Sequence, residues 1–325
     1  MCGDDMPVTT WVALGRQASA VAARWLRDGY CLGGAPFQWI PADTLVVPWF
    51  CCQTMVTPWQ LEGYRVRRVE IGDDFLADAD SVAATIASCR QRREHPVVLS
   101  CETFGIQPGS ALTEVFEETR RNHIPVVVDR THSFLGPSSS PADVDVVSIR
   151  KLLPLPETAW VTADHDLSGL VGARDEGDEL LTAARRQFLA RRGLVTFEAA
   201  EDLADERWAP VPPNDDARRE FEACDLTGYA RLVERTRDDV VAGLSRTGAI
   251  RVVNPGASCS VVLQHPDAGE IADRLRGVGV VGPLHWDRPR HLDVEWPDDL
   301  VSLPPVMDVN TIDRVIDVVT AVVDR

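Results

Sequence analysis

The first 165 residues alternate between short apolar runs and longer stretches that carry apolar side chains at helical spacing. Runs such as Val126-Val127-Val128 are apolar on both faces, which is typical of strands buried between two layers of helices. We expect strands at 45–50, 64–71, 96–101, 125–129, 144–148 and 159–162, and helices at 12–27, 58–62, 80–92 and 112–122. This alternation predicts a parallel sheet covered by helices.

The pattern changes in the second half of the chain. Residues 175–225 are rich in charge and contain a proline cluster near 210, so we interpret them as a helix followed by an irregular connector. Helices are then expected at 227–244, 268–276 and 311–323, and strands at 250–254 and 260–264. The predicted organisation is a large α/β domain at 1–180, a helical and irregular connector at 181–225, and a small α+β domain at 226–325.

Composition and charge exclude several classes of partner. The chain has 325 residues and a formal net charge of −17. Such an excess of acid disfavours binding to nucleic acid or to an anionic membrane surface, which both need basic patches. No apolar run reaches the roughly 20 residues of a membrane-spanning helix, and the first residues lack the pattern of a signal peptide. We therefore expect a cytoplasmic protein.

The eight cysteines show no metal-ligand spacing. They are scattered from Cys2 to Cys259 without a Cys-x-x-Cys pair or a Cys/His cluster, so no metal site is expected. In a reducing cytoplasm most of them should be small buried side chains.

The most informative residue for chemistry is Lys151. It is the single lysine among 33 basic residues, so arginine carries the ordinary surface charge. A lysine retained in this background suggests work that arginine cannot do, because the lysine amine can lose its proton and form a Schiff base with a carbonyl. The alternative is a solvated surface lysine at the end of a strand.

The surroundings of Lys151 favour the chemical interpretation. Asp129 ends an apolar strand upstream, and a Schiff-base lysine with an aspartate partner for a pyridine nitrogen is typical of pyridoxal phosphate (PLP) chemistry. His132 could contact the cofactor's phenolic oxygen, and Ser148 could bind its phosphate. Gly15-Arg16-Gln17 opens a helix, whose free N–H groups suit a phosphate. Asp129 as a turn residue, a structural His132 and Gly15 as a simple turn glycine are the alternatives.

The order Gly-Arg-Gln-Ala, Asp129-x-x-His132 and Ser148-x-x-Lys151 resembles the DegT/DnrJ/EryC1/StrS aminotransferase family. The likeness runs from about residue 11 to the end of the chain. It implies a type I PLP-transferase fold, with a three-layer α/β/α large domain built on a mostly parallel sheet and a small C-terminal α+β domain. It also implies a homodimer with sites at the subunit interface.

The resemblance assigns roles residue by residue. Lys151 would carry the cofactor, Asp129 would pair with the ring nitrogen and His132 would contact the ring oxygen. Gly15, Arg16, Gln17 and Ser148 would hold the phosphate. Two positions differ from the family: Cys52 stands where an aromatic side chain usually stacks on the ring, and Glu102 stands where histidine often precedes an aromatic-glycine pair.

A C-terminal loop is the candidate for substrate recognition. His285, Trp286 and Arg288 supply an imidazole, an indole and a guanidinium within four residues, between Pro283 and Pro289. We expect them to line the substrate side of the pocket, together with Glu102; the alternative is that Trp286 packs the two domains together. Arg16, Arg150, Arg288 and Arg290 are all possible clamps for a carboxylate or phosphate, because the guanidinium fork matches both.

Three functions remain open from the sequence. The first is an aminotransferase that uses a Lys151 Schiff base to pass an amino group from a small-molecule donor to a small or sugar-derived carbonyl acceptor in biosynthesis. The second is a PLP enzyme with another outcome, such as elimination, decarboxylation or side-chain replacement. The third is a catalytically inert binding protein that has kept the fold.

Overall fold

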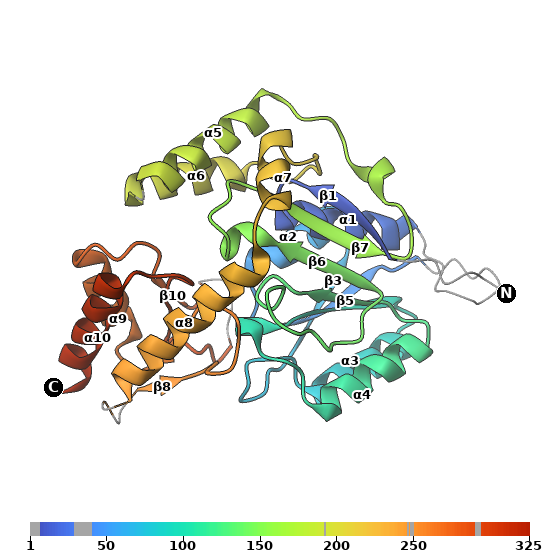
Figure 1. The fold of residues 1–325 in the computed structure, drawn as a ribbon. Helices are drawn as coiled ribbons and strands as arrows, with labels where there is room; N and C mark the ends of the chain where they lie inside the picture. The colour runs from blue at the N-terminus through green and yellow to red at the C-terminus, as the bar shows by residue number, and fades with distance from the viewer. Residues whose placement is uncertain (1–6, 29–40, 192, 246, 248–249, 290–293) are drawn as a thin grey trace. The chain divides into compact units, whose positions relative to one another are not determined.

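The computed structural model describes residues 7–28, 41–191, 193–245, 247, 250–289 and 294–325. The chain forms two units, whose elements are labelled in Figure 1. The first unit runs to Cys224, apart from two short segments at 104–106 and 135–137. Those segments group with residues 225–325 in the second unit.

The first unit is built on a seven-stranded sheet. Its strands are β1 (Val8–Val12), β2 (Thr44–Pro48), β3 (Arg65–Val69), β4 (Pro96–Cys101), β5 (Val126–Asp129), β6 (Val144–Ser148) and β7 (Ala159–Ala163). They lie in the order β1-β7-β6-β5-β4-β2-β3. The five neighbouring strands β6, β5, β4, β2 and β3 are parallel to one another. β7 runs antiparallel to both of its neighbours, β6 and β1. The predicted mostly parallel sheet is confirmed.

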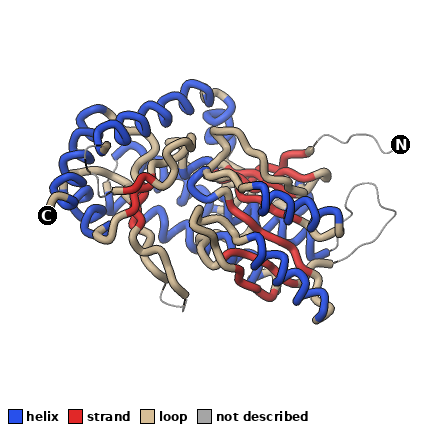
Figure 2. The backbone as a smooth tube through the Cα atoms, turned by 90° about the horizontal axis from the view of Figure 1, so that it is seen from below, coloured by secondary structure: helices blue, strands red, loops and turns tan. Residues whose placement is uncertain are grey.

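Helices cover both faces of this sheet, and Figure 2 shows its red strands with helices alongside them. α1 (Gly15–Asp28) and α2 (Gln53–Leu61) pack on the face that carries Leu45, Val97 and Val146. α3 (Ala79–Gln91) and α4 (Ser110–Arg121) pack on each other and contact β2, β3 and β5. Because successive strand residues point to opposite faces, the central strands are buried on both.

The segment after β7 differs from the prediction. The expected irregular connector is wrong, because two further helices, α6 (Leu194–Asp205) and α7 (Asp215–Glu222), follow α5 (Glu176–Arg191). The charges that suggested a solvated linker instead form ion pairs between these helices, such as Arg186–Glu220 at 2.7 Å. β1 is also additional, since we expected a helix to begin at residue 12.

The second unit has its own sheet and core. Its elements are α8 (Leu226–Leu244), β8 (Arg251–Val252), β9 (Val262–Gln264), α9 (Ala268–Gly277), β10 (Leu284–His285), β11 (Leu300–Ser302) and α10 (Val309–Val323). The four strands are antiparallel in the order β10-β11-β9-β8. Their apolar side chains pack with those of the three helices, as Leu263, Leu275 and Val315 illustrate, so the α+β prediction for this segment holds.

Candidate active site

The carboxyl ends of β5 and β6 are joined by a hydrogen-bonded chain through Thr131. The Thr131 amide donates to Asp129 Oδ1 at 2.8 Å, and the Ser148 amide donates to Thr131 Oγ1 at 3.0 Å. Asp129 is only 6% exposed. Among the described residues none donates a hydrogen bond to Asp129 Oδ2. The carboxylate is therefore held in one orientation, and its second oxygen can accept from a ligand donor.

Lys151 lies on the short 3-10 turn Ile149–Lys151 that directly follows β6. Its side chain is exposed, and no residue in the described part of the chain forms a hydrogen bond or ion pair with it. Its charge acts on the Cys52 and Cys101 thiols, which also experience the charge of Asp129. Asp129 is the register partner of Cys101 in the β4–β5 pair, so its carboxylate and this thiol lie at the same edge of the sheet.

The thiols at this edge of the sheet differ in acidity. Burial would raise the pKa of Cys52, but the Lys151 charge and hydrogen bonds with Thr54 outweigh it, so the pKa lies below its usual value. Burial raises the pKa of Cys51 to about 11 and holds that of Cys101 well above the usual range. Cys52 is the N-cap residue of α2, and of these three thiols it ionises most readily.

His132 is neutral in this site. Burial, with a smaller contribution from the Lys151 charge, lowers the pKa of its imidazole to about 3. A neutral ring can donate from one nitrogen and accept at the other, so it can hydrogen-bond a phenolic oxygen or pack against a ring.

The start of α1 lies directly against the end of β6. A Cβ atom added at Gly15 would be 2.6 Å from Ser148 Cβ, so this position has room only for glycine. The first N–H groups of a helix have no intrahelical acceptor and carry its positive dipole end. Together with the Ser148 hydroxyl they form a donor set that fits the phosphate of PLP.

The two residues after Gly15 make other contacts with their side chains. The Arg16 guanidinium donates to the Ala204 carbonyl at 2.7 Å and to Asp205 Oδ1 at 2.9 Å, and it stacks on Trp208. Gln17 Oε1 caps the helix by accepting from the Leu14 amide at 3.2 Å, and its Nε2 is fully enclosed. The Arg16 guanidinium is therefore bound to α6, whereas Gln17 Nε2 has no hydrogen-bond partner among the described residues. The phosphate role of both residues stays a prediction.

Comparisons with known proteins identify the fold. No protein-family model and no curated protein matches the sequence. Among solved structures, a DegT/DnrJ/EryC1/StrS aminotransferase from Brucella abortus is similar at 14% identity and a TM-score of 0.66, over 98% of this chain and 86% of that one. Helicobacter pylori PseC, an aminotransferase involved in pseudoaminic acid biosynthesis, is similar at 9% identity and a TM-score of 0.67, over 97% and 86%. Bacillus subtilis NtdA with bound cofactor PMP has 13% identity and a TM-score of 0.59, over 98% and 74%.

The chain has the fold of these aminotransferases. The expected type I PLP-transferase fold is thereby confirmed, and it places the carboxyl ends of β5 and β6 at the edge where open parallel sheets bind their ligands. Asp129, Ser148 and Lys151 all lie at that edge.

Glu102, a predicted substrate residue, is surrounded by hydrogen-bond partners from its own unit, and its substrate role stays a prediction. It is 1% exposed, and its carboxylate accepts hydrogen bonds from Ser133, Ser138 and Ser140 and pairs with Arg130 at 2.9 Å. Burial opposes ionisation, but the three hydroxyl groups and the arginine outweigh it and lower the pKa of Glu102. With four donors on two oxygens, this carboxylate organises the loops after β4 and β5.

The predicted substrate loop lies in the second unit. His285 Nε2 contacts the Asp298 carbonyl oxygen at 2.6 Å and Nδ1 contacts Asp287 at 2.6 Å. Trp286 Nε1 donates to Ser302 Oγ at 2.8 Å, and its ring packs edge-on against Phe104. Arg288 is exposed. These contacts explain how β10 is held, and the substrate role of the three residues stays a prediction.

Of the two other arginines predicted as possible clamps, one is described by the structure. Arg150, beside Lys151, makes a two-pronged contact with Glu201 at 3.2 and 3.4 Å. Glu201 also accepts from Arg185 at 2.7 Å, so the Arg150 side chain is tied to α5 and α6. Arg290 lies outside the described residues.

Sequence reasoning missed Thr131, which orients Asp129 and links it to Ser148. The available signal was the strand-ending Asp129, because an aspartate side chain often accepts from the backbone N–H two residues later. The contact of the Thr131 hydroxyl with the Ser148 amide spans 17 residues and depends on the fold. Within the described ranges, no group of three or more His, Cys, Asp or Glu side chains could hold a metal ion. Nor is any described helix both long and apolar enough to span a bilayer.

Proposed function

We propose that this protein is a PLP-dependent aminotransferase that acts on a small or sugar-derived carbonyl substrate. The observation that carries the proposal is that the only lysine and an oriented, buried carboxylate both lie at the ligand-binding edge of an aminotransferase fold. The structural neighbours support the transamination reaction over other PLP chemistry, since several of them are aminotransferases.

Bound PLP supplies an aldehyde for the lysine amine and a pyridine ring that withdraws electrons from the substrate carbon. In our proposal the Lys151 amine would hold the cofactor covalently and, once the amine of the donor had displaced it, would be free to move a proton to and from that carbon. Asp129 Oδ2 would accept from the ring N–H and favour the protonated nitrogen. Ser148 and the α1 N-terminus bind the phosphate, His132 contacts the ring oxygen and Cys52 lies beside the ring.

Partners and location follow from the same proposal. The substrates are a small-molecule amino donor and a carbonyl acceptor, and the enzyme acts as a homodimer in the cytoplasm. The acidic composition supports the absence of nucleic-acid and membrane partners. The described cysteines are all free thiols, which is consistent with a reducing compartment.

The test is to trap the cofactor on its lysine. Purified protein is incubated with PLP, reduced with borohydride and mapped by peptide mass spectrometry. The pyridoxyl group should be found on Lys151, and an added amino donor should convert the cofactor to its pyridoxamine form. Lys151→Arg should lower turnover by roughly 10²–10⁴-fold or more, because the proton-transfer group is lost.

A displaced lysine provides the control. The double variant Lys151→Arg/Arg150→Lys keeps a lysine one residue away and should be neither labelled nor active. Full turnover of Lys151→Arg, or labelling at the displaced lysine, would contradict the proposal.

A further inference from the structure

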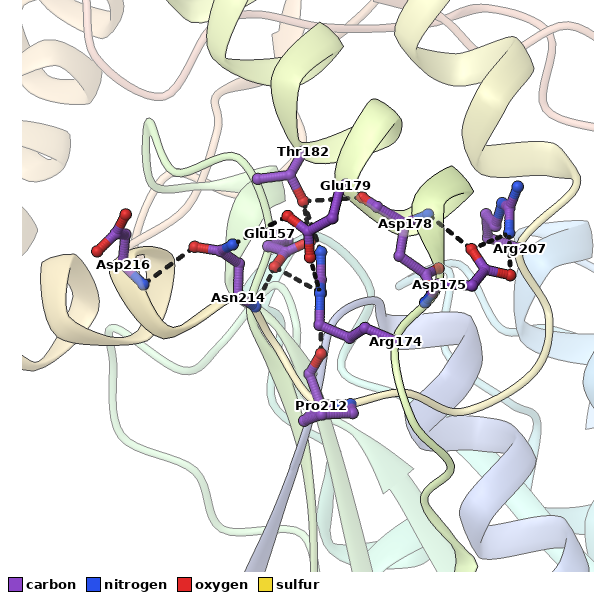
Figure 3. Close-up of polar contacts among 10 residues, drawn as sticks. All are labelled: Glu157, Arg174, Asp175, Asp178, Glu179, Thr182, Arg207, Pro212, Asn214 and Asp216. Atoms are coloured by element: carbon purple, nitrogen blue, oxygen red, sulfur yellow. Dashed lines mark hydrogen bonds and ion pairs between the residues drawn. The ribbon is translucent and has the colours of Figure 1, made fainter.

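A buried carboxylate lies six residues after Lys151. Glu157 is 1% exposed and is the centre of the polar network in Figure 3. It accepts hydrogen bonds from Arg174 Nη1 at 3.0 Å, from Thr182 Oγ1 at 2.9 Å and from the Asn214 amide. These donors come from the loop before α5, from α5 and from the start of α7. One carboxylate is therefore hydrogen-bonded to three separate parts of the segment that holds these helices.

The next residue has a strained backbone. Thr158 has φ of 103°, a region that β-branched residues very rarely occupy. It is fully buried, and its hydroxyl oxygen has no hydrogen-bond partner among the described residues. Such a conformation persists only where the surroundings over-determine it, and such residues are concentrated at functional sites. The network around Glu157 is the adjacent restraint.

The strained residue joins two parts of the proposed cofactor site. The Thr158 amide donates to the Ala13 carbonyl oxygen at 2.9 Å, two residues before α1 begins. Its carbonyl accepts from the Ile149 amide at 3.2 Å, at the first residue of the turn that carries Lys151. The orientation of Thr158 therefore sets the position of that turn relative to the α1 N-terminus.

α5 also holds the other end of this loop. Thr182 and Arg185 are three residues apart on α5 and therefore lie on the same face of the helix. Thr182 bonds Glu157, and Arg185 bonds Glu201, which pairs with Arg150 beside Lys151. The loop is thus anchored to one helix face both at the lysine turn and at Glu157.

We infer that Glu157 is a positioning residue: its anchored carboxylate keeps Thr158 in the positive-φ conformation that fixes the Lys151 turn against the start of α1. The inference rests on the proposed function only for its effect on catalysis. The effect on the turn itself can be measured in protein without cofactor.

The decisive variant is Glu157→Gln, which keeps the side-chain volume and removes the charge. Amide hydrogen exchange at Ile149 and Thr158 should accelerate by roughly tenfold in cofactor-free protein, because the two backbone bonds open locally more often. In the loaded enzyme kcat should fall by roughly 10- to 100-fold through misplacement of the lysine, with KM nearly unchanged.

A matched control and a rescue separate positioning from general stability. Glu179→Gln alters an exposed carboxylate that binds the same Arg174 guanidinium and also the Asn214 side-chain amide, so it should change neither readout. Thr158→Gly removes the strain, since glycine adopts positive φ freely. Glu157→Gln/Thr158→Gly should therefore regain most of the lost protection and kcat.

Three results would overturn the inference: unchanged exchange in Glu157→Gln, an equal effect of Glu179→Gln, or no recovery in the double variant. If Glu157→Gln does not fold, Thr182→Val removes one donor to the same carboxylate and should give the same changes at smaller size. Wild-type protein that fails to bind PLP would contradict the proposed function, and the exchange data would still decide the role of Glu157.

Discussion

His132 makes stability depend on pH in a predictable direction. Its pKa is about 3 in the folded protein against an ordinary value of 6.5, so the unfolded chain binds more protons between these values. The stabilisation is complete above pH 6.5 and is lost as the pH falls toward 3, by an amount on the order of a few kcal/mol. In wild-type protein the free energy of unfolding should therefore fall steadily from pH 6.5 to 4.5.

Urea denaturation across this range checks the prediction. His132→Asn should flatten the decline, because asparagine does not titrate. His165→Asn changes a histidine whose side chain is 51% exposed and should keep the wild-type slope. Equal slopes in wild type and His132→Asn would show that the imidazole is not held neutral by its site.

The sequence predicts a functional residue when the residue type and its neighbours along the chain are enough to identify it. Lys151 is marked by its uniqueness and Asp129 by its place at the end of an apolar strand, and both lie at the edge where they were expected. Glu102 could not be understood in this way, because its serine donors lie 31 to 38 residues further along the chain. Only the fold brings those hydroxyl groups to the carboxylate.

Among the elements, α1 and β6 are in close contact at the proposed phosphate-binding edge. Gly15→Ala places a methyl group 2.6 Å from Ser148 Cβ, so α1 must move away from β6. We expect PLP affinity to fall by at least about tenfold, which corresponds to about 1.4 kcal/mol. Fluorescence titration of cofactor-free protein with PLP measures this change.

Gly109→Ala is the matched control for an added methyl group at a helix start. Gly109 is the N-cap of α4, and a Cβ atom there would meet nothing within 4 Å. This variant should bind PLP as wild type does. Unchanged affinity in Gly15→Ala would mean that the start of α1 does not touch the phosphate.

A strand or helix can be predicted from the sequence when neighbouring residues specify it, and is missed when distant partners do. β4 and β6 were predicted residue for residue, because apolar runs bounded by turn residues specify buried strands. α6 and α7 were missed because their positions depend on ion pairs with distant partners, such as Arg16 with Asp205 and Arg186 with Glu220. This highly charged segment was therefore interpreted as irregular, although it forms helices.

For the whole molecule, the homodimer is the main untested expectation. The resemblance to the aminotransferase family implies it, and exposed apolar side chains on the first unit are consistent with a subunit contact. Val195, near the start of α6, is 78% exposed. Large exposed apolar side chains cost solubility unless a partner covers them.

Analytical ultracentrifugation tests this expectation on the cofactor-loaded enzyme. The wild-type protein should sediment with twice the 35.8 kDa mass of one chain, and specific activity should fall on dilution as the dimer dissociates. Val195→Asp should weaken dimerisation by roughly tenfold or more, because a charge would have to be desolvated in the contact. Val309→Asp, at the start of α10 in the second unit, changes a valine that is also highly exposed (70%) and should leave the dimer intact. An active, cofactor-loaded monomer would contradict the dimer, whereas a dimer that tolerates Val195→Asp would place the contact on another face of the first unit.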